Sequence, residues 1–331
     1  MRRDFVDDKQ EQTIVKYGFQ VKNRYRVRGA VLLDTDQGLR MLRQYDRLGE
    51  HFAFENRIKE HLAQKGFSMT DRVVNNLEGE SVTEWETGEK YVMYQWYAGS
   101  ECDYRSRQNL SQAAANLGRL HLALRGMTGE PVHLEENLLE RYSRRGRELK
   151  RVYRFMKEKK RKSGFELYAL SCYPEFAKKA QAAEKKLAQS EYFRKRGRET
   201  QDLCHGEYNY HNLIMTADGV ATTNFERLYF GMQLMDLAYF FRKVMEKNNW
   251  DKEKGKAVLE SYQAVAGLSG EEREFLWIVL SYPEKYWKLM NHYINGKKTW
   301  ISDKNMEKLK AVKEQEQAKE NFLNTKIWQK E

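Results

Sequence analysis

The sequence predicts an α+β fold with two lobes, a small strand-rich lobe followed by a larger helical lobe. Short apolar runs separated by turn residues fill the N-terminal part, whereas segments with helical periodicity fill most of the remainder. The 331 residues exceed one typical domain, and a hydrophobic fraction of 40% is enough for a packed core. We expect residues 1–96 to form the first lobe and residues 97–331 the second.

Turn chemistry and apolar spacing predict the elements of the first lobe. The turn "DTDQG" joins "GAVLLDT" to "GLRMLRQY", which indicates a hairpin over residues 29–45. Residues 51–67 have apolar side chains at a spacing of four and a glycine near the end, the pattern of a helix. The runs "DRVVNN" and "ESVTEWE" suggest a second hairpin over 71–86, and "KYVMYQWYAG" a buried strand.

Helical periodicity dominates the second lobe. It predicts helices over residues 110–124, 135–160, 174–190 and 235–249, and helical structure from Lys252 onward. Residues 205–226 interrupt this pattern and indicate a short loop followed by a hairpin.

Composition excludes several classes of protein. The chain has no long apolar run, so we expect no membrane-spanning helix, and its start lacks the apolar stretch of a secretory signal. The three cysteines are far apart and form no Cys/His cluster, so neither a zinc site nor a disulfide framework is expected.

The net charge of +11 is concentrated in residues 141–162, which hold twelve Lys/Arg and two Asp/Glu. Apolar residues at helical spacing in this segment predict an amphipathic helix with a basic face. The face is either simply solvated or docks an acidic partner. No nucleic-acid-binding motif accompanies the charge, so sequence-specific binding to nucleic acid is not expected.

Two short stretches with closely spaced polar and charged residues are the candidates for a catalytic site. "HGEYNYHN" occupies residues 205–212, and "NFE" occupies 224–226. Transfer from ATP needs a carboxylate that orients the acceptor, a carboxylate that holds Mg²⁺, and a lysine that contacts the phosphates.

The first stretch resembles the HGDxxxxN loop of the aminoglycoside phosphotransferase and choline kinase superfamily, which has a protein-kinase-like fold. "LGRLH" at 117–121 and "MDLAYF" at 235–240 are similar to the helices on either side of that loop. The resemblance implies ATP and Mg²⁺ as cofactors, bound weakly or lost here. It also implies a site made of His205 as a brace, Glu207 at the catalytic-base position, Asn212 and Asn224 at the metal positions, and Asp236 beneath the loop.

The chain also resembles one branch of that superfamily, the CotS-type spore coat proteins. The similar segments are "TDQGLRMLRQY", "SGFELYAL" and, most specifically, "YPEKYWKLMNHYINGKKTWISDKNMEKL" at 282–309. This resemblance implies synthesis in the mother-cell cytoplasm, incorporation into the spore coat, and coat proteins as partners.

Several positions depart from the superfamily's pattern. The resemblance places nucleotide contacts at Arg43, Glu55, Gln95 and Tyr97, where Arg43 replaces the strand lysine and Glu55, or Glu60 in a shifted register, would pair with it. Arginine and lysine are not equivalent at a tight phosphate contact. Glu207 is one methylene longer than aspartate, and a misplacement near 1 Å can cost roughly a hundredfold in rate.

Asn224 is the most serious departure, because it removes a carboxylate from the metal position. Mg²⁺ is usually held by one or two carboxylates together with the phosphates. Glu226, two residues further along, substitutes only if its side chain faces the same way.

We therefore expect a pseudokinase that acts structurally in spore coat assembly. Two alternatives stay open: an active ATP-dependent phosphotransferase of the aminoglycoside or choline type that uses Glu207, and a sensor that binds ATP without turning it over.

Overall fold

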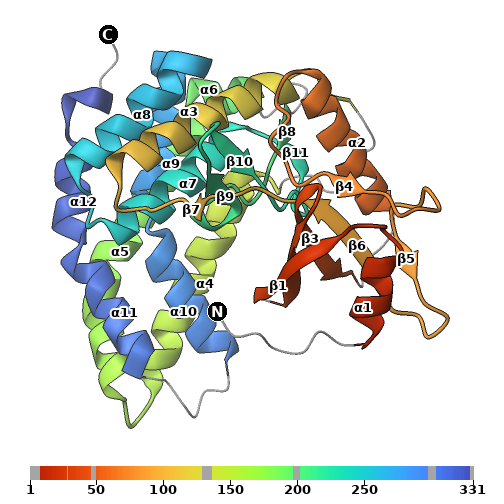
Figure 1. Cartoon of the computed structure of the whole chain (residues 1–331). Helices are drawn as coiled ribbons and strands as arrows, with labels where there is room; N and C mark the ends of the chain where they lie inside the picture. The colour runs from red at the N-terminus through yellow and green to blue at the C-terminus, as the bar shows by residue number, and fades with distance from the viewer. Residues whose placement is uncertain are drawn as a thin grey trace. The chain divides into compact units, whose positions relative to one another are not determined.

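The computed structural model describes residues 8–27, 29–45, 50–128, 136–196, 202–296 and 303–328. The chain forms two compact units, one made of residues 1–132 and 205–229, the other of residues 133–204 and 230–331. Strands dominate the N-terminal region and helices the C-terminal region, which confirms the predicted α+β class (Figure 1). Residues 205–229 belong to the first unit, together with the N-terminal strands, whereas we expected them in the second lobe. The boundary at residue 96 stays a prediction.

An antiparallel sheet forms the N-terminal part of the first unit. In spatial order its strands are β1 (Val21–Val27), β2 (Ala30–Thr35), β3 (Gly38–Gln44), β6 (Lys90–Gln95) and β4 (Val73–Val74), and β5 (Thr83–Glu84) also pairs with β6. Alternate residues of β2, β3 and β6 enter two separate apolar clusters, one of which also receives Ile14 from α1 (Asp8–Val15). Because both faces of β2 and β6 are covered, these two strands read as mostly apolar runs in the sequence.

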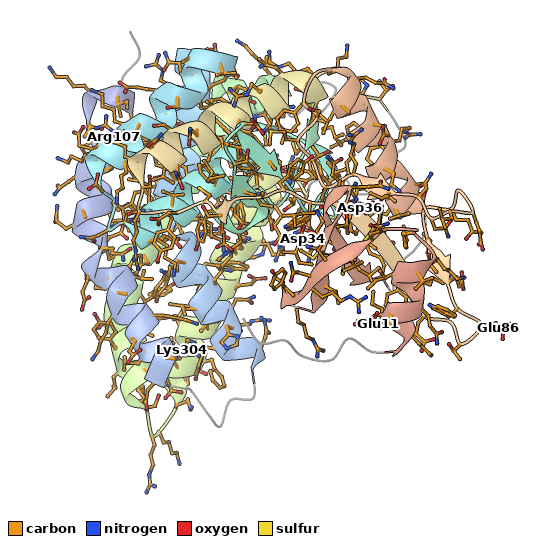
Figure 2. The ribbon with its side chains drawn as sticks, viewed as in Figure 1. Glu11, Asp34, Asp36, Glu86, Arg107 and Lys304 are labelled. Atoms are coloured by element: carbon orange, nitrogen blue, oxygen red, sulfur yellow. The ribbon has the colours of Figure 1, made fainter. Side chains whose placement is uncertain are left out.

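The hairpin of β2 and β3 is confirmed, with Thr35 opposite Gly38. The Thr35 hydroxyl donates to the Gly38 carbonyl oxygen (2.6 Å) and accepts from the Gln37 amide (3.1 Å). Gly38 has φ +94°, a value that favours glycine. Asp36, labelled in Figure 2 with Asp34, accepts a hydrogen bond from the Gln20 amide (2.9 Å) and fixes the chain before β1.

The predicted hairpin over residues 71–86 is wrong. β4 and β5 do not pair with each other, because each forms its ladder with a different part of β6. The turn between them is held locally by Asn76, whose side-chain oxygen accepts hydrogen bonds from the amides of Glu78 and Glu80. An Asx turn of this kind orders a loop without requiring that its flanks pair.

Two helices and a small sheet complete the first unit. Helix α2 (Glu50–Gln64) buries Phe54, Ile58 and Leu62, as their spacing predicts. Helix α3 (Arg107–Leu124) begins at the cap Ser106, whose side chain accepts from the Asn109 amide. Strands β7 (Ser100–Glu101), β9 (Leu213–Met215) and β10 (Val220–Thr222) form a three-stranded antiparallel sheet that contains the predicted hairpin of residues 205–226.

The second unit consists mainly of helices. They are α4 (Leu138–Glu158), α5 (Gly164–Gln189), α6 (Glu191–Arg196), α7 (Leu234–Lys247), α8 (Lys252–Ala266), α9 (Gly270–Ser281), α10 (Glu284–Asn295), α11 (Asp303–Glu314) and α12 (Glu316–Leu323), with a 3₁₀ turn at Lys326–Trp328. A two-stranded sheet pairs β8 (Asp202–Cys204) with β11 (Tyr229–Gly231). Helix α4 packs against α5 and α10 (Figure 1).

Helix α5 begins ten residues earlier than the predicted 174–190. Ser163 and Glu166 form a capping box that starts the helix, and the helix continues through Pro174. Residues Phe165, Ala169, Cys172 and Phe176 are buried on both sides of the proline, so tertiary packing outweighs its local penalty. Among the described residues, no helix combines the length and the apolar character needed to cross a membrane.

Candidate active site

The loop at residues 205–212 is held from beneath by His205. The His205 side chain is fully buried, its Nδ1 accepts from the Glu207 amide (3.2 Å), and its Nε2 lies 3.2 Å from the Thr223 carbonyl oxygen. With Nδ1 as acceptor, the proton is on Nε2, which donates to Thr223. The ring thereby joins the loop to the segment that precedes Asn224.

Gly206 is required by this loop. Its φ is +80°, and a Cβ atom at this position would lie 2.0 Å from the Arg227 carbonyl oxygen. No other residue type fits such a close approach of two backbone segments.

The tyrosine after Glu207 packs beneath the loop rather than facing a ligand. Tyr208 is fully buried, its hydroxyl donates to the Ala113 carbonyl oxygen (2.7 Å), and it accepts from the Asn116 amide (3.1 Å). The Asn116 amide also donates to the Thr222 hydroxyl (2.8 Å). Helix α3 therefore ties the loop to β10.

Asparagine side chains close the loop around Glu207. The amides of Asn209 and Asn212 each donate to the Glu207 carbonyl oxygen (2.9 Å). The Asn212 carbonyl oxygen accepts from the Thr223 amide (2.9 Å), which brings Asn212 next to the "NFE" segment. The predicted residues Glu207, Asn212 and Asn224 thus lie together.

Asn224 presents a neutral amide in place of a carboxylate, and the nitrogen of this amide donates to Glu207. Its Nδ2 lies 3.3 Å from Glu207 Oε2, and its backbone amide donates to Asp71 Oδ2 (2.8 Å). The residue has φ +66°, a left-handed conformation that asparagine and aspartate adopt more readily than most residues. An aspartate here would place a second carboxylate against Glu207.

A buried ion cluster that the sequence patterns did not predict lies next to Asn224. Lys59 Nζ lies 2.6 Å from Glu55 Oε1 and 2.8 Å from Asp71 Oδ1, and it also donates to the Asp71 carbonyl oxygen (2.8 Å). The side chains of all three residues are at most 3% exposed. Lys59 falls one helical turn after Glu55 on the apolar face of α2, and this spacing was the available signal.

In this cluster, the single ammonium group of Lys59 forms ion pairs with two carboxylates. Burial lowers the pKa of Lys59, but Asp71 and Glu55 outweigh burial and raise it above its usual value. Burial raises the pKa of Glu55, and Asp71 adds to this effect while Lys59 opposes it. Asp71, held by Lys59, then positions the backbone of Asn224.

Arg43 and Glu55, expected as a pair, are not paired. Arg43 Nη1 lies 4.0 Å from Glu226 Oε1, and its guanidinium lies over the rings of Tyr94 and Trp96. Glu55 is instead bound by Lys59, which is nearer along its own helix. The alternative partner, Glu60, lies 3.7 Å from Arg72.

A cavity of about 520 Å³ lies within the first unit. Apolar side chains of β1, β2 and β3 line one wall, and Arg43, Tyr97, Asn212 and Asn224 contribute polar atoms. The volume is within the range of roughly 300–1,000 Å³ that is usual for small-molecule sites. Burial raises the pKa of Tyr97 to about 12, so this phenol remains protonated, and it donates to the Thr70 carbonyl oxygen (2.9 Å).

Two further predicted residues, Gln95 and Asp236, do not line this cavity. The Gln95 side-chain oxygen accepts from Arg72 (3.3 Å). Asp236 is buried in the first turn of α7, in the second unit. Its support of the loop at 205–212 stays a prediction.

The residues around Glu207 supply less negative charge than a usual Mg²⁺ site. Asn212 and Asn224 donate from their amide nitrogens and keep neutral amide oxygens as acceptors, whereas Mg²⁺ is usually held by one or two carboxylates. Within the part of the chain that the structure describes, no group of three or more His, Cys, Asp or Glu side chains can hold a metal ion.

Comparison with solved structures supports the fold. The chain matches an aminoglycoside phosphotransferase from Alicyclobacillus acidocaldarius subsp. acidocaldarius DSM 446 with a TM-score of 0.84 and 16% identity, covering 98% of this chain and 96% of the other. It matches the AMP-bound complex of the spectinomycin phosphotransferase APH(9)-Ia with a TM-score of 0.63 and 13% identity, covering 96% and 97%. These likenesses confirm the predicted phosphotransferase fold.

Sequence comparison identifies the family. The chain is 24% identical over 309 residues to "Spore coat protein S" of Bacillus subtilis (strain 168), which covers 88% of this chain and 85% of that protein. The family described as "Spore coat putative kinase YutH" matches residues 10–326, nearly the whole chain. With its kinase-like fold, the chain belongs to this spore coat kinase-like family.

Proposed function

We propose that the chain is a pseudokinase that acts in spore coat assembly through protein contacts. One observation carries the proposal: the Asn224 side chain donates to Glu207 at 3.3 Å, where phosphoryl transfer needs a carboxylate that binds Mg²⁺. Family membership supports a place in the coat, and we extend the proposal to synthesis in the mother-cell cytoplasm before incorporation.

The buried ion cluster supports the same proposal. Lys59 already pairs with both Glu55 and Asp71, and Asp71 fixes the backbone of Asn224. The segment that would carry a metal ligand is therefore ordered by groups internal to the protein. A metal ion is not needed to hold it.

An active phosphotransferase of the aminoglycoside or choline type is the second candidate, and the cavity of about 520 Å³ favours it. Arg43 lines this cavity and offers a cation for phosphate, while Glu207 supplies a carboxylate next to Asn212 and Asn224. The solved relative bound to AMP supports a nucleotide-type ligand for this fold.

Thermal shift with ATP, with and without Mg²⁺ or Mn²⁺, combined with a phosphate-release assay, separates these functions. The pseudokinase proposal expects no phosphate release and no gain in Tm from the divalent metal. Metal-dependent release that Glu207→Ala abolishes would establish the active enzyme. Metal-dependent stabilisation by ATP without phosphate release would identify a nucleotide sensor.

The exposed basic face of α4 is our candidate surface for an acidic coat protein. Within residues 141–162, Arg144, Arg145 and Lys159 are in ion pairs with glutamates. The exposed residues Arg147, Lys150, Arg151 and Arg154 share one helical face and line a hollow of about 450 Å³ with Phe155 and Glu158. An acidic segment complements this charge.

Charge reversal tests this surface. The combined change of Arg147, Lys150, Arg151 and Arg154 to Glu should reduce recruitment of a tagged protein to the spore coat. The control reverses four exposed lysines on other helices of the second unit, Lys185, Lys252, Lys256 and Lys308. Equal recruitment of both variants would argue against the surface.

A further inference from the structure

The second unit contains a cavity of about 150 Å³ bounded by α4, α7, α9 and α10. This volume is well above the roughly 10–15 Å³ that one water molecule needs. None of the residues that the phosphotransferase resemblance assigns to catalysis, nucleotide or metal lines it. The cavity is therefore separate from the candidate active site.

Cations from three helices line this cavity. Arg141 and Arg145 come from α4, Arg242 from α7 and Lys288 from α10, and Glu284 is the one carboxylate among the lining residues. The lining thus carries four positive charges and one negative charge. If Arg141 is excluded, the lining of the cavity still carries three positive charges and one negative charge.

The carboxylates nearby are already engaged. Glu284 Oε2 lies 2.6 Å from Arg145, and its Oε1 lies 3.5 Å from Lys288. Arg242 pairs with Glu246 (2.8 Å), but Glu246 also has Lys285 at 3.9 Å. Adding Glu246 and Lys285 to the count leaves the surplus of positive charge unchanged.

Burial makes this surplus significant. The side chains of Arg145 and Arg242 are each 12% exposed, so water screens their charges weakly. The Nε of Arg145 is buried without a hydrogen-bond partner among the described residues. Lys288 is 50% exposed and lies where solvent can enter.

The pKa shifts of two lining residues agree with this geometry. Burial lowers the pKa of Lys288, and Arg242 lowers it further against the opposing effect of Glu284. Burial raises the pKa of Glu284, but Arg145 and Arg242 outweigh it and hold the pKa below its usual value. An additional negative charge would therefore be favoured in the cavity.

We propose that this cavity binds a small dianion of the phosphate type, either inorganic phosphate or a phosphate monoester. Two guanidinium groups and one ammonium group supply the donors that a phosphate prefers, since arginine matches oxyanion geometry and lysine acts as a point charge. These three cations exceed the one lining carboxylate by two positive charges, which favours an anion with two negative charges. The volume of about 150 Å³ restricts that anion to a compact one. The half-exposed Lys288 provides the entrance.

Calorimetry and thermal shift with sodium phosphate test the site, with sodium chloride at equal ionic strength as the reference. Phosphate should raise Tm by about 2–4 °C at saturation. O-phosphoserine in a parallel titration distinguishes the two sources, because a monoester site binds it more tightly than phosphate and a free-phosphate site binds it more weakly. Equal effects of phosphate and chloride would overturn the proposal.

Two variants of Lys288 make the test specific. Lys288→Gln should weaken phosphate binding by about tenfold, because a charged donor is lost. Lys288→Glu should abolish binding, because it replaces the half-exposed ammonium group with a negative charge beside Glu284. The matched control is Lys256→Gln, at an exposed lysine of α8 that pairs with Glu260.

A wild-type phosphate response in Lys288→Glu would refute the site. ATP turnover does not enter this test. A failure here and a failure of the pseudokinase proposal are therefore distinguishable.

Discussion

Replacing Asn224 with aspartate restores a carboxylate at the metal position with almost no change in shape. The backbone stays compatible, because aspartate tolerates the φ of +66° as asparagine does. The amide that donates to Glu207 Oε2 at 3.3 Å becomes a carboxylate oxygen at a similar distance. An attraction is thereby converted into a repulsion.

The size of this effect follows from the distance. Two unit charges 3.3 Å apart repel by about 1 kcal/mol in water and about 5 kcal/mol at an effective dielectric constant of 20. Both side chains are half-buried, so we expect a loss of about 2 kcal/mol in the free energy of unfolding at neutral pH. This corresponds to a decrease in Tm of about 4 °C.

Thermal unfolding with and without MgCl₂ measures both parts of this prediction. Asn224→Asp should unfold about 4 °C below the wild type, and Mg²⁺ should restore its Tm by neutralising the carboxylate pair. The wild type should not respond to Mg²⁺. Asn75→Asp, at an exposed residue whose side-chain oxygen accepts from Ser81, is the matched control. Equal Tm values for Asn224→Asp and the wild type would refute the reasoning.

Three further predictions address other parts of the structure. Lys59→Met should lower the free energy of unfolding by about 3 kcal/mol in urea titrations, because two buried carboxylates lose their cation. The control change Lys90→Met, at a partly exposed lysine that pairs with Glu84, should lower it by less than about 1 kcal/mol. Equal losses in the two variants would contradict a stabilising role for the buried cluster. Gly206→Ala should destabilise more than Gly29→Ala in the same assay, since both glycines have φ +80° but only Gly206 has a carbonyl oxygen within contact distance; a smaller effect at Gly206 would be inconsistent with this. The carboxylate of Glu284 has a lowered pKa, so the stability it contributes is present above pH 4.5 and is lost as the pH falls below that value. Glu284→Gln should therefore have a lower Tm than the wild type at pH 7, with the difference closing toward pH 3, and a constant difference would contradict the assignment.

Much of the fold could be predicted because local patterns determine it. The turn at Thr35–Gly38 specifies a hairpin through its own side chains, and the spacing of Phe54, Ile58 and Leu62 specifies α2. The pairing of β4 and β5 with β6, and not with each other, could not be predicted in this way. Both strands are only two residues long, so their own sequences carry little information about their partner.

In the candidate site, too, the residues close together in the sequence could be predicted, and those brought together by tertiary packing could not. Glu207, Asn212 and Asn224 belong to one short segment of chain, so the motif placed them together. Lys59 was missed because its role depends on Asp71, which reaches it through tertiary packing. The cavity in the second unit was missed for the same reason, since its cations come from helices that are far apart in the sequence.

Transfer from γ-labelled ATP tests the central claim most directly. Wild-type protein at high concentration, with Mg²⁺ or Mn²⁺ and with candidate acceptors such as choline and aminoglycosides, is compared with Glu207→Ala. The pseudokinase proposal predicts that the two proteins give the same background, because position 224 has a neutral amide where a metal-binding carboxylate is needed. Labelled product formed by the wild type and absent from Glu207→Ala would contradict the account.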